Sequence, residues 1–557
     1  MLRNRFFQKK MKLAWISFTH ALKTMPKYGW ALLAIIVLGI FLRAYHFHQW
    51  LNIGLDQVKD AQRVETVLEG KEPWPQYGPE MSNSGTGGRS KRFRLGPMYY
   101  YFEIASAGIF GNRPDSMAYP DLFFSILSIP LFFVFMNRYF SRQISLMLTG
   151  LYTISFFSLF FSHAAWNPNS IPFFTLLYLL SLLEFLERRN DTRWIWAISL
   201  GIALGVAVQL HAILLVLFPA VAVLAFAYLL KKDPRVWKKI LAVFFCVIVL
   251  NLGQVRGEIS NDFKNTKIFL NSLSKSSRTG LGGQGTMPQN FADDVSCNIE
   301  ANFYMLTAIG SDECDFSFAR IVGASVKDSD FKKLFTLPQI SRMLAMLVFS
   351  AFGYGLLVFR FRREKNPRKK YFLGLVMLFS LLSFLVVLPI IDAAVRYLMH
   401  LTFLPYIFLG ILLEILSRKW PKIYSYIAIL LFLSIAATNA YALNSLFKNP
   451  HIEGRIYLGE MEEMMGYMAG KSRSSRKVYL STVTKFRRYF NSLDYIANRQ
   501  GVDLVRTKEN TNVPAGAPLF LLGSTTTRNP KTNFGGHHYK IKNQKKFNDL
   551  VIYELEN

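Results

Sequence analysis

The chain of 557 residues is 51% hydrophobic, has a mean hydropathy of +0.21 and carries a formal net charge of +29. Such a composition is typical of proteins that cross a membrane several times. The positive excess is split among short loops without a nucleic-acid-reading motif, so it argues against nucleic-acid binding and indicates how the chain is oriented in a membrane.

About eleven apolar runs of near-spanning length predict a polytopic α-helical membrane protein. Several are shorter than the roughly 20 residues that a span needs, so they must include flanking aromatic or polar residues. The runs cover residues 30–45, 122–136, 144–161, 171–183, 194–209, 212–230, 240–252, 343–359, 371–391, 397–413 and 423–443.

Basic residues alternate along the connections between these runs. Every second connection is rich in Lys and Arg, whereas the connections between them are nearly free of both. By the positive-inside rule, the basic connections and the basic N-terminus at 1–29 are cytoplasmic. The transmembrane domain then covers 30–443, with long outer segments at 51–121 and 255–338 and an outer C-terminal part at 444–557.

The first outer segment opens with a stretch, 52–70, whose apolar residues recur at helical spacing and predict an amphipathic helix. Asp56 and Asp60 lie four residues apart on it, so both carboxylates face the same way just outside the first span. Such a pair can bind a divalent cation, Mg²⁺ or Mn²⁺, or supply a general base. The alternative is a solvated helix face with Lys59 and Arg63 as local neighbours, and the spacing alone favours it.

Four cations follow a glycine-rich stretch in the same segment. Flexible glycines beside cations suit phosphate binding near a bilayer surface. A basic patch attracted to anionic lipid headgroups explains the pattern equally well. The cations are Arg89, Lys91, Arg92 and Arg94.

The stretch 95–111 is apolar enough to look like a span. Counting it as a span would reverse every later connection and place the basic ones outside. We therefore predict a helix at the outer membrane interface, with Tyr99, Tyr100 and Tyr101 at headgroup depth.

Polar side chains gather at the predicted outer ends of several spans. Ionisable groups at such depth usually face an interior site. The alternatives are ordinary turn chemistry, an interfacial Trp and snorkelling cations. Because the polar groups converge on one membrane face, we expect them to line one binding site. The candidates are Arg43, Arg92, Arg94, Tyr100, Trp166, Asn167, Asn169, Gln209, His211, Arg396 and His400.

The three cysteines and the C-terminal part complete the prediction. Cys297 and Cys314 fall in the second outer segment, where an oxidising compartment permits a disulfide; two free thiols are the alternative. Cys246 lies in a span and is interpreted as a packing residue. From 444 onward, short strand-like runs alternate with turn residues around one helical stretch, which predicts a small extracytoplasmic α/β domain of roughly one hundred residues.

With these residues in hand, the chain resembles the GT-C class of membrane glycosyltransferases, family-39-like proteins related to protein O-mannosyltransferase and lipid A aminoarabinose transferase. The resemblance is good from about 30 to 219, and weak to absent over 255–338 and the C-terminal domain. The matching segments are LDQVKDAQR, LGPMYYYFEIASAGIFG, WNPNSIPFFTLLYLLSLLEFLE, GVAVQLHAILLVLFP and RYLMHLTFLPYIFLGILLE.

The resemblance implies a sugar donor on a polyprenyl phosphate, used from the outer face of a bacterial plasma membrane. It also implies that an aspartate of the first outer loop is the catalytic base or a metal ligand, and Asp56 occupies that position. Many relatives have Asp-Glu where this chain has Asp56-Gln57, so Asp60 is the candidate for the second carboxylate.

We therefore predict an inverting hexosyl or pentosyl transfer to a lipid, glycan or protein acceptor. Asp56 would take the acceptor proton, while Asp60 would hold a metal or orient Asp56 or the sugar. Arg92, Arg94 and Arg396 would stabilise the leaving lipid phosphate. A transporter or flippase and a non-catalytic envelope glycan assembly protein are the alternatives; a transporter predicts repeated halves with broken midplane helices, which the sequence does not show.

Overall fold

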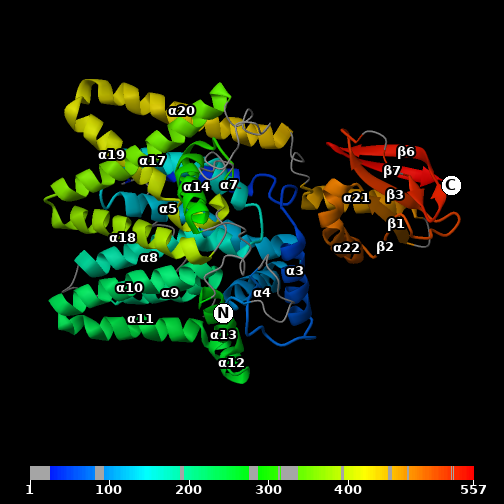
Figure 1. The fold of residues 1–557 in the computed structure, drawn as a ribbon, viewed down its shortest axis with the longest axis horizontal. Coiled ribbons are helices and arrows are strands. Elements are labelled where there is room, and N and C mark those ends of the chain that lie inside the picture. The colour runs from blue at the N-terminus through cyan, green and yellow to red at the C-terminus, as the bar shows by residue number, and fades with distance from the viewer. Residues whose placement is uncertain are drawn as a thin grey trace, which may run out of the picture.

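The structure is a computed structural model that describes residues 25–81, 93–187, 194–274, 287–311, 314, 336–390, 394–448, 455–472, 476–527, 530 and 532–556. Figure 1 shows a bundle of long, roughly parallel helices with a small α/β domain beside one of its ends. The bundle helices are α2 (Lys27–Ala44), α5 (Pro114–Met136), α6 (Arg142–Thr153), α7 (Phe156–Phe161), α8 (Ile171–Glu187), α9 (Ile195–Leu210), α10 (Ala212–Lys232), α11 (Trp237–Leu250), α14 (Met287–Thr307), α17 (Leu337–Arg363), α18 (Pro367–Ile390), α19 (Leu404–Lys419) and α20 (Pro421–Lys448).

The predicted membrane class agrees with this bundle. Within the described residues, seven helices are long and apolar enough to cross a membrane, or nine if two bent helix pairs each form one span. Of the other two predicted runs, 194–209 corresponds to the short apolar helix α9, and 144–161 is divided between α6 and α7. Within the described residues, all eleven runs therefore lie mainly on helices, and the count of eleven spans stays a prediction.

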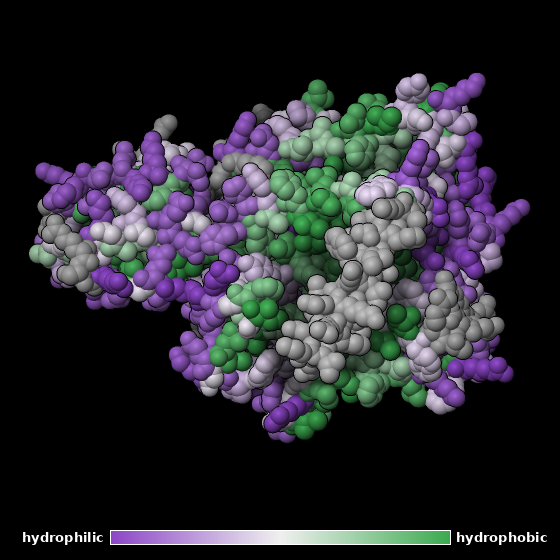
Figure 2. Space-filling model, turned by 180° about the vertical axis from the view of Figure 1, so that it is seen from behind, coloured by the Kyte–Doolittle hydropathy of each residue, from purple (hydrophilic) through white to green (hydrophobic). Residues whose placement is uncertain are grey.

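Apolar side chains hold the bundle together and also cover its outside. A large buried cluster runs through the bundle, and aromatic pairs such as Tyr178 with Phe218, 4.3 Å apart between ring centroids, fix neighbouring helices. Figure 2 shows hydrophobic residues gathered over the bundle surface, with hydrophilic residues at its ends and over the C-terminal domain. Such a belt suits contact with lipid.

Part of the second outer segment packs into the bundle. Helix α14 contacts α7, α17, α19 and α20, and its Ala301, Met305 and Leu306 are buried in the main cluster. A disulfide joins Cys297 of this helix to Cys314, so of the two alternatives that the sequence left open, the structure has the bridge.

The C-terminal domain has the predicted α/β architecture. Its five-stranded sheet has the order β2-β1-β3-β7-β6, with β1, β2 and β3 parallel and β6 and β7 antiparallel. The two helices share an apolar core with one face of the sheet. The elements are α21 (Leu458–Lys471), β1 (Lys477–Thr482), α22 (Phe490–Arg499), β2 (Asp503–Arg506), β3 (Leu519–Ser524), β4 (Asn533–Phe534), β5 (His537–His538), β6 (Lys540–Phe547) and β7 (Leu550–Glu556).

This domain is joined to two short helices of the first outer segment, α3 (Leu55–Leu68) and α4 (Met98–Phe110). Val58 and Val64 of α3 belong to the same buried cluster as Met461 and Met465 of α21. The backbone N–H of Leu458 also donates to the carbonyl of Leu51 at 2.9 Å. Figure 1 shows α3 and the C-terminal domain at the same end of the bundle.

Candidate active site

Helix α3 places the two predicted catalytic carboxylates at different depths. The helix begins after Gly54, whose N–H donates to Gln57 Oε1 at 3.0 Å, so Asp56 lies in the first turn, where the helix dipole favours an anion. The side chain of Asp56 is 71% exposed and lies 3.6 Å from Lys59 Nζ. Asp60, one turn on, is buried. The predicted pair therefore has one carboxylate at the solvent edge and one beneath it.

Asp60 is held by a hydrogen bond from a tyrosine. Tyr100 of α4 donates from its hydroxyl to Asp60 Oδ1 at 2.7 Å. Burial raises the pKa of Asp60 to about 7, the Tyr100 hydrogen bond lowers it, and the nearby charge of Asp56 raises it further. Asp60 thus carries a proton for much of the time at neutral pH.

Two further carboxylates lie close by and were missed by the sequence interpretation. Glu103 of α4 is buried, and its Oε2 has no hydrogen-bond partner. Asp121 of α5 accepts hydrogen bonds from Tyr99 Oη at 2.8 Å, Ser170 Oγ at 2.7 Å and the Trp166 N–H at 3.0 Å. Each is a lone acidic residue in an apolar stretch, a signal that marks functional positions in membrane proteins.

We call Asp60, Glu103 and Asp121 the acidic cluster. Among the described residues, no Lys or Arg forms an ion pair with any of the three. Burial, together with the charges of Asp60 and Asp121, raises the pKa of Glu103 well above its usual range. In a chain with a net charge of +29, three buried acids that form no ion pair within the described residues make a distinctive site.

Two of the three predicted interfacial tyrosines have carboxylate partners inside the protein. The side chains of Tyr99 and Tyr100 are buried and donate to carboxylates of the acidic cluster, and the headgroup depth of this helix stays a prediction. Only Tyr101 is partly exposed, and its hydroxyl donates to the Pro75 carbonyl at 2.8 Å. The sequence around Tyr99 and Tyr100 is apolar, so it did not predict that their hydroxyl groups donate to buried carboxylates.

The predicted metal site lacks converging ligands. Across the described parts of the chain, no group of three His, Cys, Asp or Glu side chains is placed to hold a metal ion. Asp56 and Asp60 differ in exposure, and Asp60 is already bonded to Tyr100. These residues do not fit a divalent cation as they stand.

Several predicted binding residues instead hold the scaffold around the acidic cluster. Asn167 donates to the Leu210 carbonyl, and Asn169 Nδ2 donates to the Ala164 carbonyl at 2.7 Å. They lie in or beside the turn η2 (Asn167–Ser170) that also carries a donor to Asp121. Trp166 is half-buried against Phe161.

Gln209 and Arg43 are likewise engaged inside the protein. Gln209 accepts from the Met98 N–H at 3.2 Å and donates to the Leu250 carbonyl at 3.0 Å, which ties α4 to α9 and α11. Arg43 is fully buried, and its Nε donates to Ser125 Oγ at 2.8 Å. Both are positioned to fix helices and not to face solvent.

The remaining predicted residues form a separate group or lie apart. His211 lies against the ring of Tyr397, 5.7 Å between ring centroids, and the Arg396 guanidinium lies 5.1 Å from the same ring. His400 is buried with its Nε2 2.5 Å from Ser383 Oγ. Arg94 is half exposed and pairs with Glu80 at 2.8 Å, and the prediction for Arg92 lies outside the described residues.

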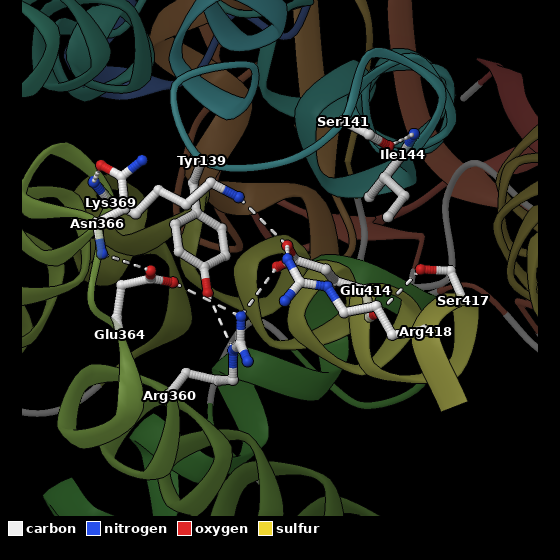
Figure 3. Close-up of polar contacts among 10 residues, drawn as sticks. All are labelled: Tyr139, Ser141, Ile144, Arg360, Glu364, Asn366, Lys369, Glu414, Ser417 and Arg418. Atoms are coloured by element: carbon white, nitrogen blue, oxygen red, sulfur yellow. Dashed lines mark hydrogen bonds and ion pairs between the residues drawn. The ribbon is translucent and has the colours of Figure 1, made fainter. Parts of the chain in front are cut away.

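A second polar cluster lies among the basic connections and has a different character (Figure 3). Glu414 is buried and lies 2.6 Å from Arg418, 3.3 Å from Lys369 and 3.8 Å from Arg360. Arg360 also donates to Tyr139 Oη at 3.2 Å. Every carboxylate here has a cationic partner, so this network joins α17, α18 and α19 without offering a reactive group.

Comparison with known proteins supports the predicted class. Residues 95–253 match the family model described as dolichyl-phosphate-mannose-protein mannosyltransferase. The match includes Glu103, Asp121, Trp166 and Gln209 and begins after Asp60. It confirms the predicted resemblance to GT-C membrane glycosyltransferases. No curated protein sequence matches the chain.

Solved structures with a similar fold have low sequence identity. ArnT from Cupriavidus metallidurans bound to undecaprenyl phosphate is 11% identical, with 95% of this chain and 98% of that chain covered and a TM-score of 0.47. The oligosaccharyltransferase AglB from Archaeoglobus fulgidus, in complex with an inhibitory peptide and a dolichol-phosphate, is 11% identical; 84% of this chain and 63% of that chain are covered, with a TM-score of 0.45. The chain thus spans less than two thirds of the AglB chain. The Saccharomyces cerevisiae protein O-mannosyltransferase Pmt1–Pmt2 complex bound to the sugar donor is 13% identical, covering 53% and 39%, with a TM-score of 0.32.

Proposed function

We propose that the protein is a membrane glycosyltransferase that moves a sugar from a polyprenyl phosphate to an acceptor. The reaction would occur at the bundle end where α3, α4 and the C-terminal domain meet, which is the extracytoplasmic side by the distribution of basic loops. The observation that carries the proposal is the buried acidic cluster next to Asp56, which forms no ion pair with Lys or Arg among the described residues and lies in and beside the segment that matches the family model.

Asp56 would act as the general base. Its carboxylate is exposed at the rim, so an acceptor hydroxyl can approach it. As the acceptor oxygen forms a bond to the anomeric carbon, its proton passes to Asp56, and the bond from the anomeric carbon to the phosphate oxygen breaks. Attack from the face opposite the leaving phosphate inverts the anomeric configuration.

The other residues would position and stabilise. Asp60, bonded to Tyr100, fixes the first turns of α3 against α4 and so orients Asp56. Arg94 and Arg396 are the candidates for neutralising the lipid phosphate as negative charge develops on it. A divalent cation would supply the same charge stabilisation if one is recruited with the donor.

Turnover by purified protein tests this proposal. The full chain in lipid nanodiscs is incubated with a panel of polyprenyl-phosphate sugars, and release of polyprenyl phosphate is followed with wild type and Asp56→Asn. We expect release with at least one donor by wild type and a large loss in the variant. Equal release by both proteins would contradict the role of Asp56, and movement of intact donor across the membrane without release would favour a transporter.

A further inference from the structure

The helices α12 (Leu252–Ser260) and α13 (Lys264–Ser274) leave the side of the bundle. The chain bends by 62° between the segment that ends at Leu250 and α12. Figure 1 shows the two helices beyond the end of α11, near α4, extending past the edge of the bundle. This helix pair therefore begins where a span ends.

One side of the pair carries an exposed apolar stripe. Leu252, Val255 and Ile259 recur at helical spacing on α12 and are 54%, 42% and 63% exposed. Phe263, in the turn before α13, and Leu270 on α13 are also apolar and more than half exposed. Exposed apolar residues gathered on one helix pair mark an interaction site.

The opposite side of α12 is packed closely on the first outer segment, so the stripe cannot turn inward. Two glycines, four residues apart, allow this approach. A Cβ on Gly253 would lie 3.0 Å from Pro97 Cγ, and a Cβ on Gly257 would lie 2.8 Å from the ring of Tyr77. The orientation of the helix pair is thus fixed by backbone contact.

Helix α13 in turn holds the chain at Arg94. Asn265, which is buried, accepts from the Arg94 N–H at 2.7 Å and donates to the Arg94 carbonyl at 3.0 Å. The rings of Phe93 and Phe269 lie 4.8 Å apart. The position of Arg94 therefore follows that of α13.

We propose that the α12–α13 pair is seated in the lipid–water interface of the leaflet on the α3 side, with phospholipid as its partner. Continuity with α11 places the stripe at membrane depth. The exposed cations Arg256, Lys264 and Lys267 flank the stripe, as in helices that bury an apolar face beside anionic headgroups. Through Asn265, the interfacial position of α13 holds Arg94 at the depth of lipid phosphates. Only this statement about Arg94 rests on the proposed function.

Depth-dependent fluorescence quenching tests whether the α12–α13 pair lies in the lipid–water interface, and it does not require a measurable enzymatic turnover. Ile259→Cys in a Cys246→Ser background is labelled with an environment-sensitive fluorophore, leaving the Cys297–Cys314 disulfide intact. The full chain is placed in phosphatidylcholine–phosphatidylglycerol nanodiscs. We expect strong quenching by lipids with a nitroxide near the headgroup and little quenching by aqueous iodide. The same label at Lys542→Cys on the exposed face of β6 should give the reverse pattern.

Quenching of the Ile259 site by iodide and not by lipid nitroxides would overturn the proposal. Asn265→Ala then separates the interfacial position of the α12–α13 pair from its effect on Arg94. We expect unchanged quenching at Ile259 but a donor KM raised about tenfold with kcat retained, because the two hydrogen bonds that hold the Arg94 backbone are lost. An unchanged KM would remove the link to Arg94, and if no donor is turned over by wild type, the quenching result still decides the seat.

Discussion

Carboxylates are buried at both ends of the bundle, but they are compensated in opposite ways. Among the basic connections, Glu414 is surrounded by Arg360, Lys369 and Arg418. At the other end, Asp60 and Glu103 have hydroxyl groups and each other as neighbours, and no cation pairs with them among the described residues.

The difference shows what each end can do. A buried carboxylate within reach of several cations stays ionised and serves as a structural link. A buried carboxylate without a cation lowers its charging cost by holding a proton. The first arrangement fixes helix ends, whereas the second provides Asp60, whose protonation can change near neutral pH, which suits acid–base chemistry.

The largest expected effect is a loss of turnover on changing Asp56, at the end of the bundle that carries the acidic cluster. Asp56→Asn should lower kcat by about 10²–10⁴-fold, because the amide cannot take the acceptor proton. The matched control is Glu69→Gln, an exposed carboxylate at the C-terminal end of the same helix that pairs with Lys71 at 2.7 Å. Release of polyprenyl phosphate is measured for both in folded preparations. Wild-type turnover by Asp56→Asn would remove this residue from the mechanism.

Much of the fold was predictable because helices that cross a membrane need long apolar runs, which can be recognised in the sequence. Apolar run length and the alternation of basic loops predicted the helices of the bundle, and turn residues predicted the α/β domain. The sequence did not predict that α14 packs among the spans, because its apolar face, with Ala301 and Met305, is interrupted by polar residues such as Asn302. Long-range packing of such a helix depends on partners far along the chain.

The site was predictable only in part. Asp60 was identified by its spacing from Asp56, yet spacing could not say that Tyr100, forty residues on, would bury and bond it. Glu103 and Asp121 were overlooked because each stands alone in an apolar stretch, without a partner at motif distance. Their neighbourhood arises from the meeting of α3, α4 and α5, which is a tertiary property.

At the opposite end of the bundle, removing the Glu414 carboxylate should lower stability. Glu414→Gln leaves three cations without their shared carboxylate, and we expect a loss of about 3 kcal/mol in stability, at the low end of the range for buried pairs because Arg418 is largely exposed. Thermal unfolding in detergent should show this loss of stability as a lower Tm for Glu414→Gln than for wild type. Glu364→Gln, with Arg360 as its ion-pair partner, is the control and should cost less. Equal Tm values for wild type and Glu414→Gln would show that the network is not structural.

The pH dependence of stability should reveal Asp60. Its pKa is about 7 in the folded protein, above the ordinary value of 3.8, so the folded state binds the proton more tightly than the unfolded state does. The Asp60 contribution is therefore most favourable below pH 3.8, falls as the pH rises from about 4 to about 7, and then levels off. Asp60→Asn should lack this fall, so its Tm relative to wild type should increase over that interval.

Tyr100→Phe sharpens the same measurement. Removing the hydroxyl donor raises the pKa of Asp60 further, because that hydrogen bond favours the ionised form. The fall in stability should then extend to higher pH than in wild type. Parallel Tm curves for wild type, Asp60→Asn and Tyr100→Phe would mean that Asp60 is ionised throughout.

The smallest effect concerns a site where one titratable cation is shared by two carboxylates. His48 Nδ1 lies 2.9 Å from Asp115 of α5, and its Nε2 lies 2.9 Å from Glu462 of α21, so the ring joins the bundle to the C-terminal domain. Gln500 also contacts this site, donating to the Glu462 carbonyl at 3.2 Å. Burial lowers the pKa of His48, but the two carboxylates more than offset this and raise it above 6.5.

Docking of the C-terminal domain should therefore weaken as the pH rises through the raised His48 pKa, since both contacts need a ring N–H and the charged ring favours both carboxylates. Hydrogen exchange of α21 measures this, after correction for the intrinsic pH dependence of exchange. Wild type should lose protection as the pH rises through the raised His48 pKa, above 6.5, whereas His48→Gln should be less protected at low pH and show no such transition. Protection of α21 that is independent of pH in wild type would show that the apolar contacts between α3 and α21 suffice, and that His48 takes no part in holding the domain.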